Sequence, residues 1–173
     1  SSITTPTREV GGGSAANTII SMAEVGVRTS YVGKVKGDKL GNVFVTDMHS
    51  GNVDYDTPFA PSNHKEDTGR CIVLITPDGE RTMNTCPGAS ANLYASDIPK
   101  AAFRGISGVF IEGYLFYSTH GTELISESIN RAIRNNGFTA ISLSDVSCVD
   151  KYRDFLLNNP LKIFTKDILE LKF

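Results

Sequence analysis

Apolar residues in the first fifty positions recur twice with the period of a helix, and a short apolar run separates the two patterns. The first stripe consists of Ala16, Ile19, Ile20 and Ala23. Because residues at i, i+3, i+4 and i+7 share one face of a helix, this stripe predicts a helix with Ser14 as its N-cap and Gly26 at its end. Residues 29–35 then predict a strand, and residues 42–51 predict a second amphipathic helix.

Residues 53–86 show a different pattern, in which short strand candidates follow one another without a helical period between them. The candidates are residues 53–59, 70–76 and 81–86. Strands that lack crossover helices pair antiparallel, so this part of the chain predicts a small antiparallel sheet.

The clearest turn signal in this sheet is Asp78-Gly79, a favoured two-residue hairpin turn. A two-residue turn at this point would place Cys71 directly opposite Cys86. In a reducing compartment we expect these two cysteines to remain thiols rather than to form a disulfide.

The alternation of helix and strand returns from residue 108 onward. Residues 108–112 and 138–145 predict buried strands, and residues 121–137 predict a helix that ends at Gly137 as its C′ residue. Its apolar stripe consists of Ile125, Ile129, Ala132 and Ile133. A strand, a helix and a strand in this order form a right-handed crossover unit with parallel strands.

Polar residues follow both strands of this unit at their carboxyl ends. Glu112 ends the first strand, and Ser144 and Asp145 end the second. Ligands of open α/β sheets bind outside the carboxyl ends of the strands, so these residues mark a candidate site. Two structural alternatives remain, in which Asp145 caps the following helix and Glu112 reaches solvent.

Composition and charge narrow the classes of partner. The chain has 173 residues, 40% of them hydrophobic, and a formal net charge of -2. It contains no apolar run of the roughly 20 residues that span a membrane, and its mixed charges form no basic stripe for nucleic acid. Its three cysteines lack metal-ligand spacing, and no metal site is predicted. We therefore expect a cytoplasmic protein with a small-molecule partner.

The glycines that precede the first helix have three interpretations. Gly11, Gly13 and Ala16 fit the pattern G-x-G-x-x-A of dinucleotide-binding turns, which would indicate a dehydrogenase. That motif follows a hydrophobic strand, whereas "SSITTPTREV" is polar and contains Pro6. The run could also be a flexible loop. Asn17, close behind the glycines, favours instead a ligand with several hydroxyl groups, because its amide offers two donors and one acceptor.

At this point the residues resemble a known family. The stretch "GGSAANTIISMAEVGVRTSYVGKVKGDKLG", together with "TGRCIVLITPDGERTMNT" and "IEGYL", is similar to sugar and nucleoside kinases of the ribokinase (PfkB) family. The resemblance runs from Gly12 to Leu157, and residues 160–173 do not read as its continuation. Ile19 and Lys36 depart from the first signature of the family, which usually has a small residue and a glycine there.

The resemblance implies an α/β fold with a Rossmann-like, mostly parallel core and a small β-sheet lid. It divides the chain into a core start in residues 1–52, a mainly β lid in residues 53–90 and a core continuation in residues 91–173. It also implies that the hydroxyl groups of the substrate are bound by Gly12, Gly13, Asn17 and Glu112. In the lid, strand alternation places Arg81, Met83 and Thr85 on one face of the hairpin and Thr82 and Asn84 on the other, and Arg81, Met83 and Asn84 are candidates for covering the substrate.

The implied activity is transfer of the γ-phosphoryl group of ATP, with Mg²⁺, to a primary hydroxyl. "GERTMNT" and "LSDVSCVDKYRDF" are similar to adenosine kinase-like members, so adenosine is favoured over ribose or fructose. The second signature of the family, with its aspartate base, does not occur in these residues. We therefore expect an incomplete sequence whose nucleotide-binding half is missing and which is inactive alone. The alternative is a non-catalytic, kinase-like binding module. A homodimer through the lid is also expected.

Overall fold

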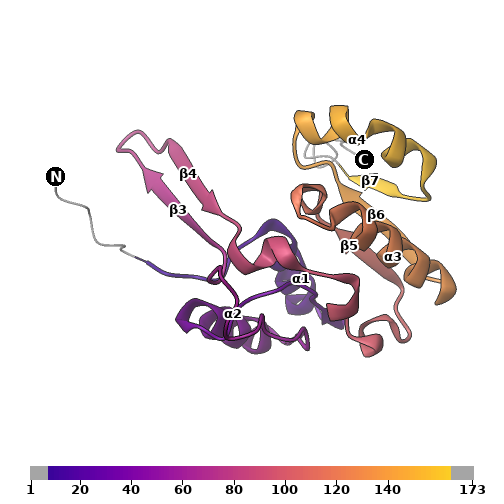
Figure 1. Cartoon of the computed structure of the whole chain (residues 1–173), viewed down its shortest axis with the longest axis horizontal. Helices are drawn as coiled ribbons and strands as arrows, with labels where there is room; N and C mark the ends of the chain where they lie inside the picture. The colour runs from indigo at the N-terminus through magenta and orange to yellow at the C-terminus, as the bar shows by residue number, and fades with distance from the viewer. Residues whose placement is uncertain (1–7, 165–173) are drawn as a thin grey trace.

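The computed structural model describes residues 8–164, which form two α/β units and a hairpin that projects from them (Figure 1). The amino-terminal unit and the carboxy-terminal unit each contain parallel strands. The hairpin follows the amino-terminal unit in the chain, and a series of short 3-10 helices then leads into the carboxy-terminal unit.

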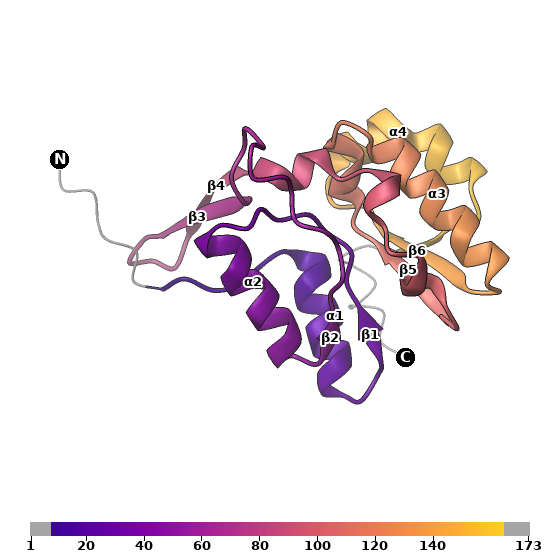
Figure 2. The same ribbon diagram turned by 60° about the horizontal axis from the view of Figure 1, so that its bottom comes forward.

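The amino-terminal unit packs two helices against a pair of short parallel strands (Figure 2). Its elements are α1 (Ser14–Glu24), β1 (Thr29–Ser30), α2 (Lys39–Ser50) and β2 (Val53–Asp54). Its buried core consists of Ala16, Val35, Met48, Val53 and Tyr55. The expectation that residues 53–59 join the antiparallel sheet was wrong, because β2 pairs with β1 across the α2 crossover.

The ends of α1 and α2 show which local signals set the helix boundaries. The N-cap of α1 is Gly13, with φ of 104°, and not Ser14 as the sequence suggested. Gly26 adopts the left-handed conformation expected of a C′ residue, with φ of 88°. In α2, the Asp38 carboxylate accepts hydrogen bonds from the Gly41 N–H and the Thr68 N–H, both at 2.8 Å. Asp38 therefore joins the helix start to the segment that leads into the hairpin.

The hairpin consists of β3 (Arg70–Ile75) and β4 (Arg81–Cys86), and every residue in both strands is exposed. Cys71 pairs with Thr85, so the expected pairing of Cys71 with Cys86 was wrong by one residue. Glycine in the left-handed region commonly closes three-residue hairpin loops. Here Gly79 has φ of 87°, and the Thr76 N–H donates to the Glu80 carbonyl oxygen, so the loop holds three residues instead of two. The extra residue places the two cysteines on opposite faces of the sheet.

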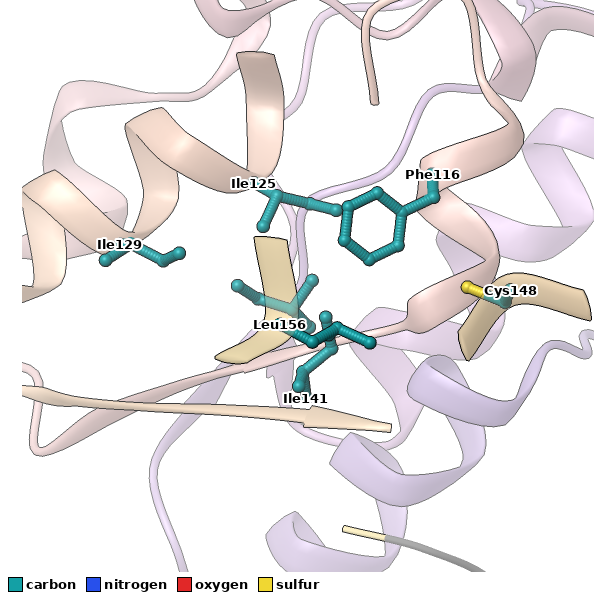
Figure 3. Close-up of a cluster of buried hydrophobic side chains, with 7 residues drawn as sticks. Phe116, Ile125, Ile129, Ile141, Cys148 and Leu156 are labelled. Carbon is teal, nitrogen blue, oxygen red and sulfur yellow. The ribbon is translucent and has the colours of Figure 1, made fainter. Parts of the chain in front are cut away.

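The carboxy-terminal unit is a three-stranded parallel sheet in the order β5-β6-β7. Its elements are β5 (Gly108–Ile111), α3 (Gly121–Arg134), β6 (Phe138–Ser142), α4 (Val146–Asn158) and β7 (Lys162–Phe164). The predicted strand-helix-strand unit is confirmed. In Figure 3, Ile125 and Ile129 of α3 lie near Ile141 of β6 and Leu156 of α4 in one buried cluster.

The end of α3 differs in detail from its prediction. The left-handed residue is Asn136, with φ of 57°, rather than Gly137. The Gly137 N–H reaches the Ala132 carbonyl oxygen at 2.8 Å, and the Asn136 N–H reaches the Ile133 carbonyl oxygen at 3.0 Å. These are the two hydrogen bonds of a Schellman motif, in which asparagine can take the place of the usual glycine at C′.

Two contacts connect the amino-terminal unit to the part of the chain that follows the hairpin. An apolar cluster centred on Leu93, Phe103 and Leu124 includes the partly buried Val32 and Val109. A buried ion pair joins Lys34 to Asp97, with 2.5 Å between Nζ and Oδ2 and side chains that are 7% and 16% exposed. No sequence pattern had indicated this pair, because a lysine and an aspartate 63 positions apart carry no periodic signal.

Candidate functional site

The amino-terminal end of α1 leaves backbone N–H groups open to a ligand. Gly13 provides no side-chain cap, and the first turn contains no acidic residue. A Cβ atom built on Gly12 would meet nothing within 4 Å, so this backbone is accessible. The first N–H groups of a helix lack intrahelical partners and carry partial positive charge, which suits ligand oxygens.

The glycine segment is anchored to the second helix. The Gly11 N–H donates to Asp47 Oδ2 at 2.9 Å, and a Cβ atom on Gly11 would lie 2.8 Å from the same oxygen. A larger residue at this position would require the Asp47 carboxylate to shift from the place where it accepts this hydrogen bond. The anchor therefore fixes the backbone just before Gly12 and Gly13.

Asn17 is exposed on α1 and borders a shallow, open hollow. The hollow is lined by Asn17, Thr18, Ser21, Met22 and Val25. The amide of Asn17 is therefore available to a ligand. Within residues 8–164, no hydrogen bond joins Asn17 or the glycines to Glu112.

Glu112 lies immediately after β5, and the structure brings it together with the end of β6. The hydroxyl of Ser144 donates to Glu112 Oε1 at 2.6 Å, and the hydroxyl of Ser142 donates to the same oxygen at 2.9 Å. The other oxygen, Oε2, is buried and has no hydrogen-bond partner among residues 8–164. The expectation that Glu112 and Ser144 meet at the strand ends is confirmed, whereas sequence analysis did not single out Ser142.

Asp145 caps the helix that follows it, which was the structural alternative to a role in the site. Its carboxylate accepts from the Cys148 N–H at 2.7 Å and thereby caps α4. The hydroxyl of Tyr117 also donates to it, at 3.2 Å. Burial, followed by the charges of Asp145 and Glu112, raises the pKa of the Cys148 thiol, so this cysteine stays protonated at neutral pH.

Tyr31 connects the amino-terminal unit to Glu112 electrostatically. Its ring packs beside Tyr55 and Phe44 and lies so close to Gly33 that a Cβ there would meet the ring. Burial raises the pKa of the Tyr31 hydroxyl, and the charge of Glu112 raises it further. Tyr31 was not among the sequence candidates, because one aromatic residue in a strand usually belongs to the core.

The hairpin candidates lie on exposed strands. Arg81 and Met83 share one face, and Asn84 lies on the other, because alternate residues of a strand point to opposite faces. Both faces also carry exposed apolar side chains: Ile72 and Leu74 on one, and Val73, Ile75 and Met83 on the other.

Neither a metal cluster nor a membrane span is found in the part of the chain that the structure describes. No group of three or more His, Cys, Asp or Glu side chains there could hold a metal ion. None of the described helices combines the length and the apolar character needed to cross a bilayer.

Comparison with known proteins identifies the family to which this fold belongs. A family model for "pfkB family carbohydrate kinase" matches residues 4–165. The chain belongs to the pfkB family of carbohydrate kinases. The match begins before Gly12 and extends past Leu157 into β7, so the expected limits of the resemblance were too narrow.

Two solved structures resemble this pfkB chain at more than 30% identity. An adenosine kinase from Sinorhizobium meliloti is 35% identical, with a TM-score of 0.80 over 88% of this chain and 46% of its own. A probable sugar kinase from Rhizobium etli is 33% identical, with a TM-score of 0.77 over 85% of this chain and 44% of its own. The fold is therefore the ribokinase-like α/β fold, as expected.

A curated relative, the ribokinase of Mus musculus, is 26% identical over 91 residues, which are 53% of this chain and 28% of its own length. The chain thus spans less than half the length of these relatives. It contains part of the family fold.

Proposed function

We propose that the full-length protein transfers the γ-phosphoryl group of ATP to a primary hydroxyl of a nucleoside, with adenosine as the first candidate. Its membership of the pfkB family supports a sugar or nucleoside kinase. The 35% identity to an adenosine kinase favours adenosine within that class.

The observation that carries this proposal is the state of the Glu112 carboxylate. One of its oxygens accepts hydrogen bonds from two serine hydroxyls, and the other is buried without a partner in the described part of the chain. An ionised carboxylate only accepts hydrogen bonds, so the missing partner must be a donor. A ribose hydroxyl is a donor of this kind, and we assign it to Glu112.

We assign the other acceptor contacts to Gly12, Gly13 and Asn17. The glycines leave the N–H groups at the start of α1 open to ligand oxygens, and the exposed amide of Asn17 can donate and accept. Closure of the hairpin would bring Arg81, Met83 or Asn84 over the substrate. These residues would orient the acceptor, and orientation together with charge stabilisation supplies most of the catalysis in phosphoryl transfer.

ATP would supply the phosphoryl group, and Mg²⁺ would neutralise charge on its phosphate oxygens. The described residues include no cluster that fits a metal ion. We therefore assign the residues of this chain to the acceptor alone and assign no catalytic base among them.

The test is a kinase assay of the full-length protein with ATP, Mg²⁺ and a panel of adenosine, ribose and fructose, read as ADP formed. Adenosine should give the highest kcat/KM. Glu112→Ala should lower kcat/KM more than Asn17→Ala, because a charge-assisted hydrogen bond contributes about 1.5–3 kcal/mol and a neutral one about 0.5–1.5 kcal/mol. If both variants lost affinity for ATP and kept their affinity for the acceptor, the assignment would be wrong.

The similarity to the probable sugar kinase of Rhizobium etli and to mouse ribokinase favours a second candidate, a ribose or fructose kinase. The same panel ranks the acceptors directly. Binding of an acceptor without any ADP formation would instead indicate a non-catalytic binding module.

We further propose that a second copy of the chain covers one face of the hairpin. Both faces carry exposed apolar side chains, and only one face can turn toward a substrate. Sedimentation of the full-length protein should show a dimer, and the double variant Ile72→Ser and Leu74→Ser or the variant Val73→Ser should shift it toward monomer. A wild-type monomer at all concentrations would exclude this interface.

We also propose a cytoplasmic location. The three cysteines are free, and the hairpin register keeps Cys71 and Cys86 on opposite faces. Free thiols are typical of reducing compartments. Fractionation of cells that express the full-length protein tests this assignment.

A further inference from the structure

We propose that Ser142 and Ser144 are positioning residues, which orient the Glu112 carboxylate so that Oε2 faces a substrate hydroxyl. This inference rests on the proposed function. It assigns a role to two serines that lie at the end of β6 and that do not themselves contact the substrate.

The hydrogen bonds of the three side chains converge on one oxygen. Ser144 and Ser142 donate to Glu112 Oε1 at 2.6 Å and 2.9 Å, and the Gly113 N–H is directed at Ser142 Oγ at 3.3 Å. Ser142 thus accepts a hydrogen bond from the backbone and donates one to the carboxylate. The last torsion of a glutamate side chain is broad and nearly two-fold, so an unrestrained carboxylate would rotate. Two donors on the same oxygen fix its plane.

The fixed plane leaves the second oxygen in a costly state. Glu112 Oε2 is buried and lacks a partner within the described residues. A buried acceptor without a partner is unfavourable, and this penalty disappears when a ligand donates to it. The serines therefore keep Oε2 available, instead of allowing the carboxylate to turn and satisfy both oxygens on nearby donors.

The backbone is arranged to hold Ser144 in place. Ser144 has φ of 65°, in the left-handed region that non-glycine residues seldom adopt. The neighbouring Gly113 leaves room for it, since a Cβ atom on Gly113 would lie 2.7 Å from Ser144 Oγ. Strain of this kind persists where the surrounding structure enforces it, and it clusters at functional sites.

The experiment measures kcat/KM of the full-length protein for adenosine, 2′-deoxyadenosine and 3′-deoxyadenosine. First, Glu112→Ala identifies the hydroxyl that Glu112 binds, because the variant should have little further effect on the analogue that lacks it. Ser144→Ala should then lower kcat/KM for adenosine by about tenfold and for that analogue by less than about twofold. If a sugar is the preferred acceptor, the same design applies to ribose and its deoxy analogues.

Matched variants separate positioning from folding. Ser144→Gly relieves the backbone strain but lacks the hydroxyl, so it should lose activity as Ser144→Ala does while unfolding no more easily. Ser142→Thr keeps the hydroxyl and should recover most of the activity lost in Ser142→Ala. Ser50→Ala, at an exposed serine that ends α2, is the control for a serine far from Glu112 in the sequence.

The outcomes distinguish this inference from the proposed function. If Ser144→Ala and Ser144→Gly lowered kcat/KM equally for adenosine and both deoxy analogues, the serines would be structural and the inference would be overturned while the kinase assignment stood. If Glu112→Ala left every acceptor unaffected, or if no acceptor were phosphorylated, both would be overturned.

Discussion

The hairpin and the carboxy-terminal unit are both built from short strands of similar apolar content, yet they have opposite environments. Ile75 of β3 is 68% exposed, whereas Ile141 of β6 is fully buried between α3, α4 and the neighbouring strands. The difference is the crossover helix. Such a helix covers a parallel sheet, whereas the three-residue loop between β3 and β4 leaves no helix to cover the hairpin. Connection length therefore decides which strands are covered by helices and which are left exposed on both faces.

The largest expected effect comes from the same substitution in the two environments. Ile141→Ala should lower the free energy of unfolding of the full-length protein by about 3–4 kcal/mol, because it removes buried methyl groups and leaves a cavity. Ile75→Ala should change it by less than about 0.5 kcal/mol. Denaturant unfolding measures both. Equal losses would mean that the hairpin is buried in solution and that the comparison fails.

Two glycines give the next contrast. A Cβ on Gly113 would collide with the Ser142 carbonyl oxygen, whereas one on Gly79 would meet nothing within 4 Å. Gly113→Ala should therefore cost about 3 kcal/mol through displaced backbone. Gly79→Ala should cost about 1 kcal/mol, because only the left-handed conformation of the loop is disfavoured. Thermal unfolding of the two variants in parallel tests the order, and a reversed order would contradict it.

The carboxy-terminal unit and the hairpin also show which parts of the fold the sequence predicts and which parts it does not. The apolar stripe of α3 and the parallel β5–α3–β6 unit followed from periodicity, because burial of one helix face leaves a regular pattern. The hairpin register did not, since Asp78-Gly79 suits both a two-residue and a three-residue loop. One additional loop residue changes which face of β3 is matched with which face of β4, without changing the hydrophobic pattern.

The candidate site divides in the same way. Glu112 and Ser144 could be brought together from the rule that parallel strands end at one edge, whereas the bond from Ser142 depends on side-chain orientation. The buried Lys34–Asp97 pair was also unpredictable, because it depends on how the amino-terminal unit packs against the 3-10 segment that precedes β5. Local patterns thus predict elements, and contacts between distant elements require the three-dimensional arrangement.

A third prediction compares two aspartates whose pKa values are both lowered. Burial alone would raise the pKa of Asp38, but hydrogen bonds from the Thr68 and Gly41 backbone lower it overall. The pKa of Asp78, in the exposed hairpin loop, is lowered chiefly by the hydrogen bond from the Thr76 hydroxyl. Asp38→Ala should cost about 1–2 kcal/mol at pH 7, since it leaves two N–H groups without their acceptor.

The pH dependence of this loss of stability follows from the direction of the Asp38 pKa shift. A carboxyl whose pKa is lower in the folded state adds stability above the unfolded value of about 4, and that stability disappears as the pH falls through the folded value. The difference between wild type and Asp38→Ala should therefore be constant from pH 7 to 5 and shrink below about pH 4. Unfolding measured between pH 7 and 2 tests this, and a gap that widens in acid would refute it.

The smallest effect on stability concerns the cysteines, where the two regions should differ in rate rather than in free energy. Cys71 and Cys86 lie exposed in the hairpin, and Cys148 is buried at the start of α4. Because the thiolate is the reactive form, burial slows Cys148 both by blocking access and by raising its pKa. In the native full-length protein, a thiol reagent should promptly modify the hairpin cysteine on the face that the proposed second copy leaves open, and Cys148 only on unfolding. Cys71→Ser and Cys86→Ser should each change the free energy of unfolding by less than about 0.5 kcal/mol, and one of them should remove the fast-reacting thiol. Slow reaction of both hairpin thiols would mean that a partner or the rest of the protein covers both faces of the sheet, and the contrast with the buried carboxy-terminal unit would then fail.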